Sequence, residues 1–373
     1  MPAETGRAPH QAGGGIFGVG DYWADRLADG AVEPAADAPS VRAATPLSAD
    51  RDRRAAELLA LVTARARGRR LDDLYPVTDT ATPEGPCRTI RSQLADVPPV
   101  AGDPKAARRA LGGALELVWG VGPWHAAALR MAGTESLADL AHHPRFGAEA
   151  ARVWSAVAAA DPAAAFWAVR RRCGGAHPLL WCTRGLFDPS DFLFVDIETL
   201  GFFGVAVILI GVAEWRDSVL DVTQYVAESV ADEPALLAAL AQHAAGKQAL
   251  VTFNGLAFDV PVLAARAAYY GMGEAARPLR ALPHFDLLHQ ARRAWQDRLP
   301  DCQAVTIERE LLGIVRPDDL PGAYVPPFYE AYQQEGEVGP LTYIIDHNRW
   351  DLAGLGRIFT HLPPLALGSG DVD

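Results

Sequence analysis

Between residues 192 and 226 the chain alternates short apolar segments with brief polar or glycine-containing turns. Segments 192–197, 205–215 and 219–226 are apolar or rich in β-branched residues, which is typical of strands that are largely buried. Because the turns between them are short, we expect the three strands to be antiparallel neighbours in one sheet.

After the third strand the pattern changes to helix. Residues 232–246 begin with Asp232, a candidate N-cap, and end at Gly246, a helix-stop signal. The apolar segment QALVTF, 248–253, predicts a fourth strand, and residues 257–270 predict the next helix.

Several more helices are expected, the last of them over residues 341–361. The predicted order is three strands, a helix, a strand and then several helices. This order resembles that of a ribonuclease H-like fold. The fold class expected for this part of the chain is therefore α/β, with a mixed sheet flanked by helices.

The first half of the chain has different patterns. Residues 1–45 are rich in Gly, Ala, Pro and Asp and are expected to be disordered. A helix is predicted over 51–67, short strands or loops over 76–100, and Ala-rich helices over 104–172. Turn signals in 173–190 indicate a linker.

These patterns predict four parts of the chain. They are a disordered segment over 1–45, a smaller, mainly helical domain over 46–185, the ribonuclease H-like domain over 186–365 and a flexible tail over 366–373.

Composition narrows the class of protein. The net charge is −12, with the acidic excess in the second half and most arginine clusters in the first. The four cysteines form no CxxC pair, which argues against a zinc site. No signal peptide is evident, and the longest apolar run, 202–213, is too short to cross a bilayer. We therefore expect a cytoplasmic protein that does not insert into a membrane.

Two carboxylates stand at the end of the first predicted strand. Asp196 and Glu198 are two residues apart, so both side chains point to the same face of a strand. Burying two carboxylates together is costly unless a cation lies between them. Hard oxygen ligands favour Mg²⁺ or Mn²⁺. The alternative is a strand end that meets water.

Two further segments carry acids at comparable places. In LVTFNGLAFDVPVL a strand leads into an Asn254-Gly255 turn and then into a helix that starts near Asp259. Asn254 either hydrogen-bonds a substrate phosphate or sugar, or only serves the turn. On the last helix His347 and Asp351 are four residues apart and share a face, as a metal-site pair or as an ordinary polar pair.

Taken together, these segments resemble the DEDD superfamily of 3′–5′ exonucleases over residues 186–362. The superfamily motifs DxE, N(x)₄D and a final Asp preceded by His or Tyr correspond to DIE, NGLAFD and HNRWD here. Three connecting segments sharpen the match: HFDLLHQARRAW, TIERELLGIVRPDDLPG and VPPFYEAYQ. They resemble the YprB-like ribonuclease H-like family.

The resemblance implies a two-metal phosphodiesterase site. Asp196 would bridge two Mg²⁺ or Mn²⁺ ions, Glu198 and Asp351 would complete one shell, and Asp259 would hold the other ion. His347 would be the general base. It lies four residues before Asp351, the spacing of Tyr-type members, whereas His-type members have the histidine five residues before.

The implied function is a metal-dependent 3′–5′ exonuclease that hydrolyses DNA, in DNA repair or metabolism. A superfamily 2 helicase partner is implied by the resemblance alone. The alternatives are a ribonuclease, a structure-specific endonuclease of the same fold, and a nucleic-acid-binding adaptor with weak catalysis.

Residues near the motifs have two interpretations each. Asp286 is either a helix N-cap, which we prefer, or an acid that supports the site. Arg316 grips phosphate or forms a salt bridge with an acid such as Glu308. Three tyrosines stack on bases or, by default, pack in the core: Tyr324, Tyr329 and Tyr332.

In the first half, residues 114–145 resemble a helix-hairpin-helix motif. Gly120 and Gly122 would form the hairpin between two helices. In that family the hairpin amides and the following helix N-terminus contact DNA phosphates without reading sequence. The alternative is a purely structural helical hairpin.

Overall fold

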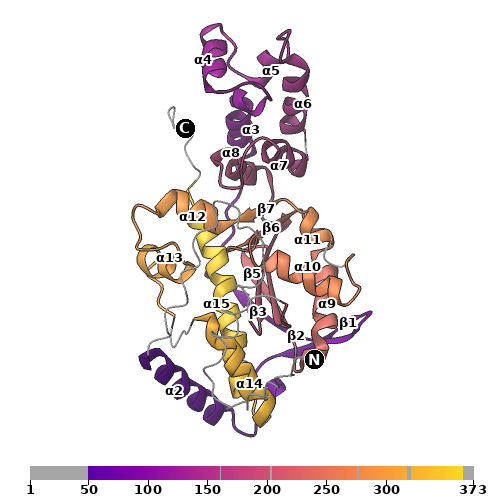
Figure 1. Ribbon diagram of the computed structural model, residues 1–373, viewed down its shortest axis with the longest axis vertical. Helices are drawn as coiled ribbons and strands as arrows, with labels where there is room; N and C mark the ends of the chain where they lie inside the picture. Colours follow the sequence, from indigo (N-terminus) through magenta and orange to yellow (C-terminus); the bar gives the residue numbers. More distant parts are fainter. Residues whose placement is uncertain (1–48, 160, 202–203, 275–276, 317–320, 364–373) are drawn as a thin grey trace, which may run out of the picture. The chain divides into compact units, whose positions relative to one another are not determined.

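The structure, a computed structural model, describes residues 49–159, 161–201, 204–274, 277–316 and 321–363. Its centre is a mixed sheet of seven strands in the order β1-β2-β5-β4-β3-β6-β7 (Figure 1). The strands are β1 Val77–Thr82, β2 Gly85–Leu94, β3 Phe192–Thr199, β4 Val207–Arg216, β5 Val219–Val226, β6 Ala249–Thr252 and β7 His284–Asp286.

The strands predicted between residues 192 and 253 are confirmed. β3, β4 and β5 pair antiparallel in that spatial order, and β6 pairs parallel to the other edge of β3. β3 lies inside the sheet, between β4 and β6, and nearly all of its side chains are buried. This explains the continuous apolar run in the sequence.

Helices cover both faces of this sheet (Figure 1). α15 contacts β3, β4 and β5, and α9 contacts β1, β2 and β4 from the opposite face. The helices of this part are α9 Glu233–Ala244, α10 Asp259–Tyr269, α11 Arg277–Ala281, α12 Leu287–Trp295, α13 Ala304–Leu311, α14 Val325–Glu335 and α15 Gly339–His361. A mixed sheet with flanking helices agrees with the predicted fold class.

The start of α9 differs from the prediction in its detail. Asp232 precedes the helix, but its side chain does not cap it. The carboxylate instead accepts the amide of Ser229, closing a capping box of the preceding turn. Gly246 follows the helix with a φ of +87°, a conformation that suits glycine.

The first half of the chain contributes two strands to the same sheet. β1 and β2 form a hairpin, and β2 pairs antiparallel with β5. All seven strands lie in one compact unit, which begins at Leu58. The sheet therefore takes strands from both sides of residue 185, the expected domain boundary. The partner of β2 lies more than a hundred residues further along the chain, which no local pattern reveals.

The remaining helices of the first half range from four to eighteen residues in length. They are α2 Ala49–Ala66, α3 Pro104–Gly112, α4 Pro123–Met131, α5 Leu137–Leu140, α6 Gly147–Ala158, α7 Pro162–Arg170 and α8 Pro178–Cys182. Three start with proline at the first helical position after an aspartate or histidine whose side chain caps the helix. α8 occupies the segment that was predicted to be a linker.

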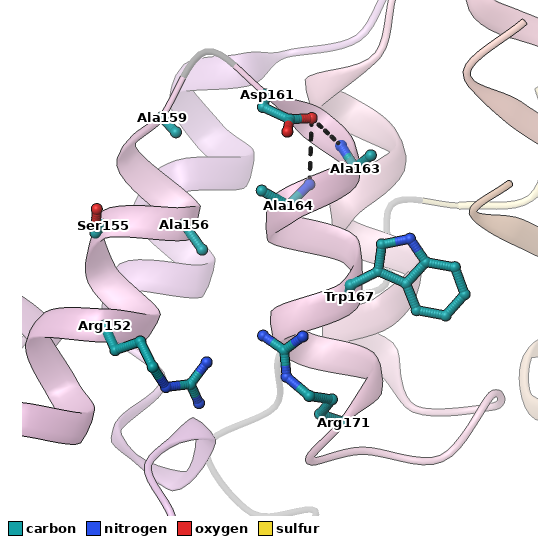
Figure 2. A pocket seen from close by; sticks show the side chains of 9 residues that line it. All are labelled: Arg152, Ser155, Ala156, Ala159, Asp161, Ala163, Ala164, Trp167 and Arg171. Atoms are coloured by element: carbon teal, nitrogen blue, oxygen red, sulfur yellow. Dashed lines mark hydrogen bonds between the residues drawn. The ribbon is translucent and has the colours of Figure 1, made fainter. Parts of the chain in front are cut away.

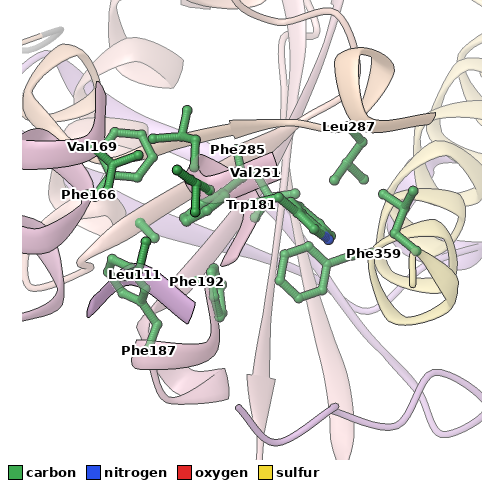
Figure 3. Packing of buried hydrophobic residues seen from close by; sticks show 14 of the residues in the cluster. Leu111, Phe166, Val169, Trp181, Phe187, Phe192, Val251, Phe285, Leu287 and Phe359 are labelled. Atoms are coloured by element: carbon green, nitrogen blue, oxygen red, sulfur yellow. The ribbon is translucent and has the colours of Figure 1, made fainter. Parts of the chain in front are cut away.

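An aromatic cluster joins α7 and α8 to the end of the sheet (Figure 3). Phe285 of β7 lies 5.2 Å from Phe166, 6.0 Å from Trp181 and 5.9 Å from Phe192, measured between ring centroids. Trp181 in turn contacts Phe359 of α15. Edge-to-face contacts of this kind add to area burial, so the α8 segment is part of the core.

In the described part of the chain, no helix combines the length and the apolar character that crossing a membrane requires. The predicted disordered segment 1–45 and the predicted tail 366–373 lie outside the described residues.

Candidate active site

Asp196 stands near the middle of the sheet, on the face that α15 covers. It pairs with Gly211 of β4 across the antiparallel ladder. Asn348 of α15 donates a hydrogen bond of 2.8 Å from its Nδ2 to Oδ2 of Asp196. Asn348 is itself fully buried and accepts a hydrogen bond from Gln224 of β5. A chain of buried amides therefore orients the carboxylate.

This contact depends on a glycine behind it. A Cβ at Gly211 would lie 2.0 Å from Oδ1 of Asn348 and 2.8 Å from Cδ1 of Leu352. Any side chain there would force the side chains of Asn348 and Leu352 to shift, and with them the contact to Asp196. Gly211 thus allows the last helix to bring its polar residues up to Asp196.

Glu198, His347 and Asp351 form a tighter group. One ligand atom from each lies within 4.8 Å of the others. His347 Nε2 is 3.4 Å from Oδ2 of Asp351, and its ring stacks on Tyr343 at 5.9 Å. The i, i+4 spacing therefore places His347 and Asp351 on one face of α15.

The neighbouring acid on α15 points elsewhere. Asp346, at the position where His-type sites have histidine, lies 3.2 Å from Arg349 and interacts with Tyr75. Of the two residues, it is His347 that contacts Asp351 and Glu198.

Asp259 is the first residue of α10 and is buried. The turn before it is held by Asp286, whose carboxylate accepts the amides of Asn254 at 2.8 Å and Leu256 at 3.0 Å. Asp286 also accepts the amide of Leu288, so the preferred N-cap interpretation is confirmed. Fixing the turn in this way fixes where Asp259 enters the site.

The turn itself is strained at one residue. Asn254 has a φ of +66°, a left-handed conformation that costs free energy for residues other than glycine. Its side chain is exposed and has no hydrogen-bond partner in the described part of the chain. Strain of this kind is concentrated at functional sites.

The acids lie close enough for their charges to act on one another. Burial raises the pKa of the Asp196 carboxyl well above its usual range, and the charges of Asp351, Glu198 and Asp259 raise it further. Burial also raises the pKa of Asp259 to about 7, with a further contribution from Asp286 and Asp351. Without a cation the fold thus holds carboxylates that repel one another.

One arginine relieves part of this repulsion. The buried Arg316 donates hydrogen bonds of 2.6 Å to both Glu308 and Asp351. Burial alone would lower the pKa of this guanidinium, but the two carboxylates raise it. The salt-bridge interpretation of Arg316 with Glu308 is therefore confirmed, and the bridge extends to a predicted site residue.

The donor set fits a hard divalent cation. Glu198, His347 and Asp351 offer ligand atoms within 4.8 Å of one another, and the charges of these acids and of Asp259 act on Asp196 beside them. Arg316 contacts Oδ1 of Asp351, whereas His347 lies nearer Oδ2. Such a set suits Mg²⁺ or Mn²⁺, and binding one would remove the repulsion among the carboxylates.

Other predicted residues lie outside this group. Gly120 has a φ of +86° and packs near Phe146, and Gly122 directly precedes α4. The element before this turn is a three-residue 3₁₀ helix, Leu115–Leu117, in place of the expected first helix. Tyr324 and Tyr329 are buried, as the core-packing interpretation predicted.

Sequence reasoning missed Asn348 and Gln224. Asn348 lies between His347 and Asp351 on α15, but asparagine carries no charge and so does not stand out as a candidate site residue. A signal was present: a polar residue at the core-facing position of an otherwise apolar helix needs a partner.

Comparison with known proteins agrees with this geometry. Residues 193–363 match a family model described as RNase_H superfamily, a range that holds all five proposed catalytic residues. Over 194 residues the chain is 30% identical to the uncharacterized protein YprB of Bacillus subtilis (strain 168). The match covers 49% of this chain and 46% of that protein, so the chain spans about half of its curated relative. Residues 193–363 are thus similar to the ribonuclease H superfamily, in agreement with the mixed sheet and its flanking helices.

Proposed function

We propose that this chain is a metal-dependent 3′–5′ exonuclease that hydrolyses phosphodiester bonds in DNA, with a role in DNA repair or metabolism. The observation that carries the proposal is the convergence of Asp196, Glu198, Asp259 and Asp351 from one strand and two helices within a region similar to the ribonuclease H superfamily. The order of the acids along the chain matches the DEDD exonuclease motifs.

The four acids would hold two Mg²⁺ or Mn²⁺ ions. Asp196 interacts with each of the other three carboxylates, so it is the residue best placed to serve both ions. Glu198 and Asp351 would complete the coordination shell of one ion, and Asp259 would contribute to the coordination shell of the other. Bound divalent ions supply Lewis-acid stabilisation and acidify water, which phosphodiester hydrolysis needs at neutral pH.

His347 would accept the proton of the attacking water. Its ring is buried and held by Tyr343, and Nε2 faces Asp351 and Glu198. An imidazole exchanges protons readily near neutral pH. The carboxylate of Asp351 would favour the charged form of the ring once the proton has moved.

The choice of DNA and the 3′–5′ direction rest on the resemblance to DEDD exonucleases, as does a superfamily 2 helicase as partner. The contact of the Gly120–Gly122 turn with DNA phosphates belongs to the same proposal. The backbone φ of Gly120 would let the turn expose amides to a phosphate.

Digestion of end-labelled substrates tests the proposal. Single- and double-stranded DNA labelled at the 5′ or the 3′ end, with RNA of the same sequence, is incubated with Mg²⁺, Mn²⁺ or EDTA. We expect a ladder that shortens 5′-labelled DNA stepwise from its 3′ end, and none in EDTA. Internal cuts would indicate an endonuclease, faster RNA cleavage a ribonuclease, and metal-independent or absent cleavage would contradict the proposal.

The role of Asn254 can be separated from that of its turn. Asn254→Gly keeps the left-handed backbone without strain and removes only the side chain. If the side chain binds substrate, KM for DNA should rise about tenfold, the equivalent of one hydrogen bond to a charged group of about 1.4 kcal/mol. The measurement is steady-state cleavage together with thermal melting.

Asn254→Ala is the matched variant, because it also removes the side chain but retains the strain. It should show the same KM with a lower melting temperature. A wild-type KM for Asn254→Gly would assign Asn254 to the turn alone.

A further inference from the structure

A strip of exposed tryptophans and arginines runs along α6 and α7, outside the acidic site. It comprises two adjoining hollows of about 610 Å³ and 470 Å³ that share Arg152 and Arg171 in their walls. Trp167 lines one hollow, and Trp119 and Arg172 line the other. Because they share two arginines, the hollows form one continuous surface region.

Both tryptophans are exposed to solvent, Trp119 much more than Trp167. Trp119 is 75% exposed and Trp167 is 36% exposed. The guanidinium of Arg172 lies 5.8 Å from the ring of Trp119, a cation–π contact. Because Trp119 is so exposed, it offers aromatic surface to a ligand from solvent.

The arginines of the strip converge on one space. Figure 2 shows Arg152 of α6 and Arg171, which follows α7, pointing toward one another across the first hollow. Arg152 is paired with Glu149. Arg171 feels the charge of the same Glu149 at longer range, and Arg172 contacts the ring of Trp119. The acid that lines the first hollow, Asp161, caps α7 through the amides of Ala163 and Ala164.

We infer that this strip binds single-stranded nucleic acid, with bases stacked on Trp119 and Trp167 and phosphates held by Arg171 and Arg172. Aromatic surfaces interleaved with arginines suit a flexible strand, since every base has a stacking face and every nucleotide a phosphate. A duplex hides its bases and would gain only the arginine contacts. The inference rests on the proposed nuclease function and adds a substrate-holding surface to it.

Binding without catalysis tests the inference. The full chain carrying Asp196→Asn, in EDTA, is titrated into fluorescein-labelled dT₂₀, U₂₀ or a 20-base-pair duplex, and anisotropy gives Kd. We expect either single strand to bind more tightly than the duplex. Trp119→Ala combined with Trp167→Ala should raise Kd for the single strand at least tenfold.

Charge and position are tested separately. The double variant Arg171→Gln, Arg172→Gln should bind single strands more weakly. The slope of log Kd against log salt concentration should fall by the amount expected for about one to two lost phosphate contacts. Tyr269→Ala is the matched control, because Tyr269 is also an exposed aromatic residue, 72% exposed on α10. This variant should bind the single strand as tightly as the parent protein does. Circular dichroism and thermal melting show that each variant is folded.

Two results would overturn the inference. One is tighter binding of the duplex. The other is an unchanged Kd in both the double tryptophan and the double arginine variants. This second result includes the case in which only Trp124→Ala, a substitution beside Gly122, weakens binding. These measurements involve no cleavage, so they separate the two proposals. If the strip variants bind single strands normally but the protein cleaves DNA, the proposed nuclease function stands and the binding inference fails. If the strip variants lose binding but the protein does not cleave DNA, the binding inference stands and the proposed nuclease function fails.

Discussion

Replacing Asp196 with asparagine is expected to lower the rate of DNA cleavage by about 10³-fold or more while the protein stays folded. The carboxylate is the one acid that interacts with each of the other three. Losing its ligand atoms should remove about 4 kcal/mol or more of transition-state stabilisation, at about 1.4 kcal/mol per tenfold. Single-turnover cleavage of 5′-labelled DNA gives the rate.

The same variant should be no less stable than the wild type when metal is absent. Asparagine keeps an oxygen that accepts the hydrogen bond of Asn348, and it removes a carboxylate whose pKa burial and neighbouring charges raise. We therefore expect an equal or higher melting temperature in EDTA. Asp346→Asn is the matched control on α15, because Asp346 points toward Tyr75 and Arg349. This control variant should cleave DNA as the wild type does. Equal cleavage by Asp196→Asn and wild type would contradict the assignment.

Replacing Glu233 with glutamine should lower the free energy of unfolding by about 3–5 kcal/mol, the usual effect of removing one partner of a buried ion pair. Glu233 is fully buried. It pairs with Arg266 of α10 through hydrogen bonds of 2.7 and 2.6 Å, and it accepts the hydroxyl of Tyr270 and the amide of Val207. Urea unfolding measures the change.

Two controls make this result specific. Glu274→Gln changes the same functional group in an exposed pair with Arg277 and should leave stability unaltered. The double variant Glu233→Leu, Arg266→Met should lose less stability than Glu233→Gln alone, because no unpaired charge stays buried. A loss below about 1 kcal/mol in Glu233→Gln would show that water or another group compensates Arg266. The Glu233–Arg266 pair holds α10, and α10 begins at Asp259. Loss of the pair is therefore expected to affect the position of Asp259 as well.

The sequence predicted the local parts of the site because each rests on a local rule. Strand alternation put Asp196 and Glu198 on one face, and helical spacing put His347 beside Asp351. The sheet interior was also predictable, since β3 and β4 are apolar nearly throughout.

What the sequence did not reveal depends on tertiary approach. Nothing local indicates that Gly211 makes room for Asn348, or that Arg316 reaches Asp351, 35 residues away. The place of β2 beside β5 is likewise a long-range pairing. Trp119 and Trp167 belong to the same class, because only folding puts them along a strip with shared arginines.

Manganese binding tests the central claim most directly, namely that the carboxylates of β3, α10 and α15 form one divalent-metal site. Electron paramagnetic resonance of free Mn²⁺, titrated into wild type and Asp196→Asn, measures it without any substrate. We predict that the wild type depletes the free Mn²⁺ signal and melts at a higher temperature with Mn²⁺, and that Asp196→Asn does neither. Equal Mn²⁺ binding by the two proteins, or none by the wild type, would contradict the account.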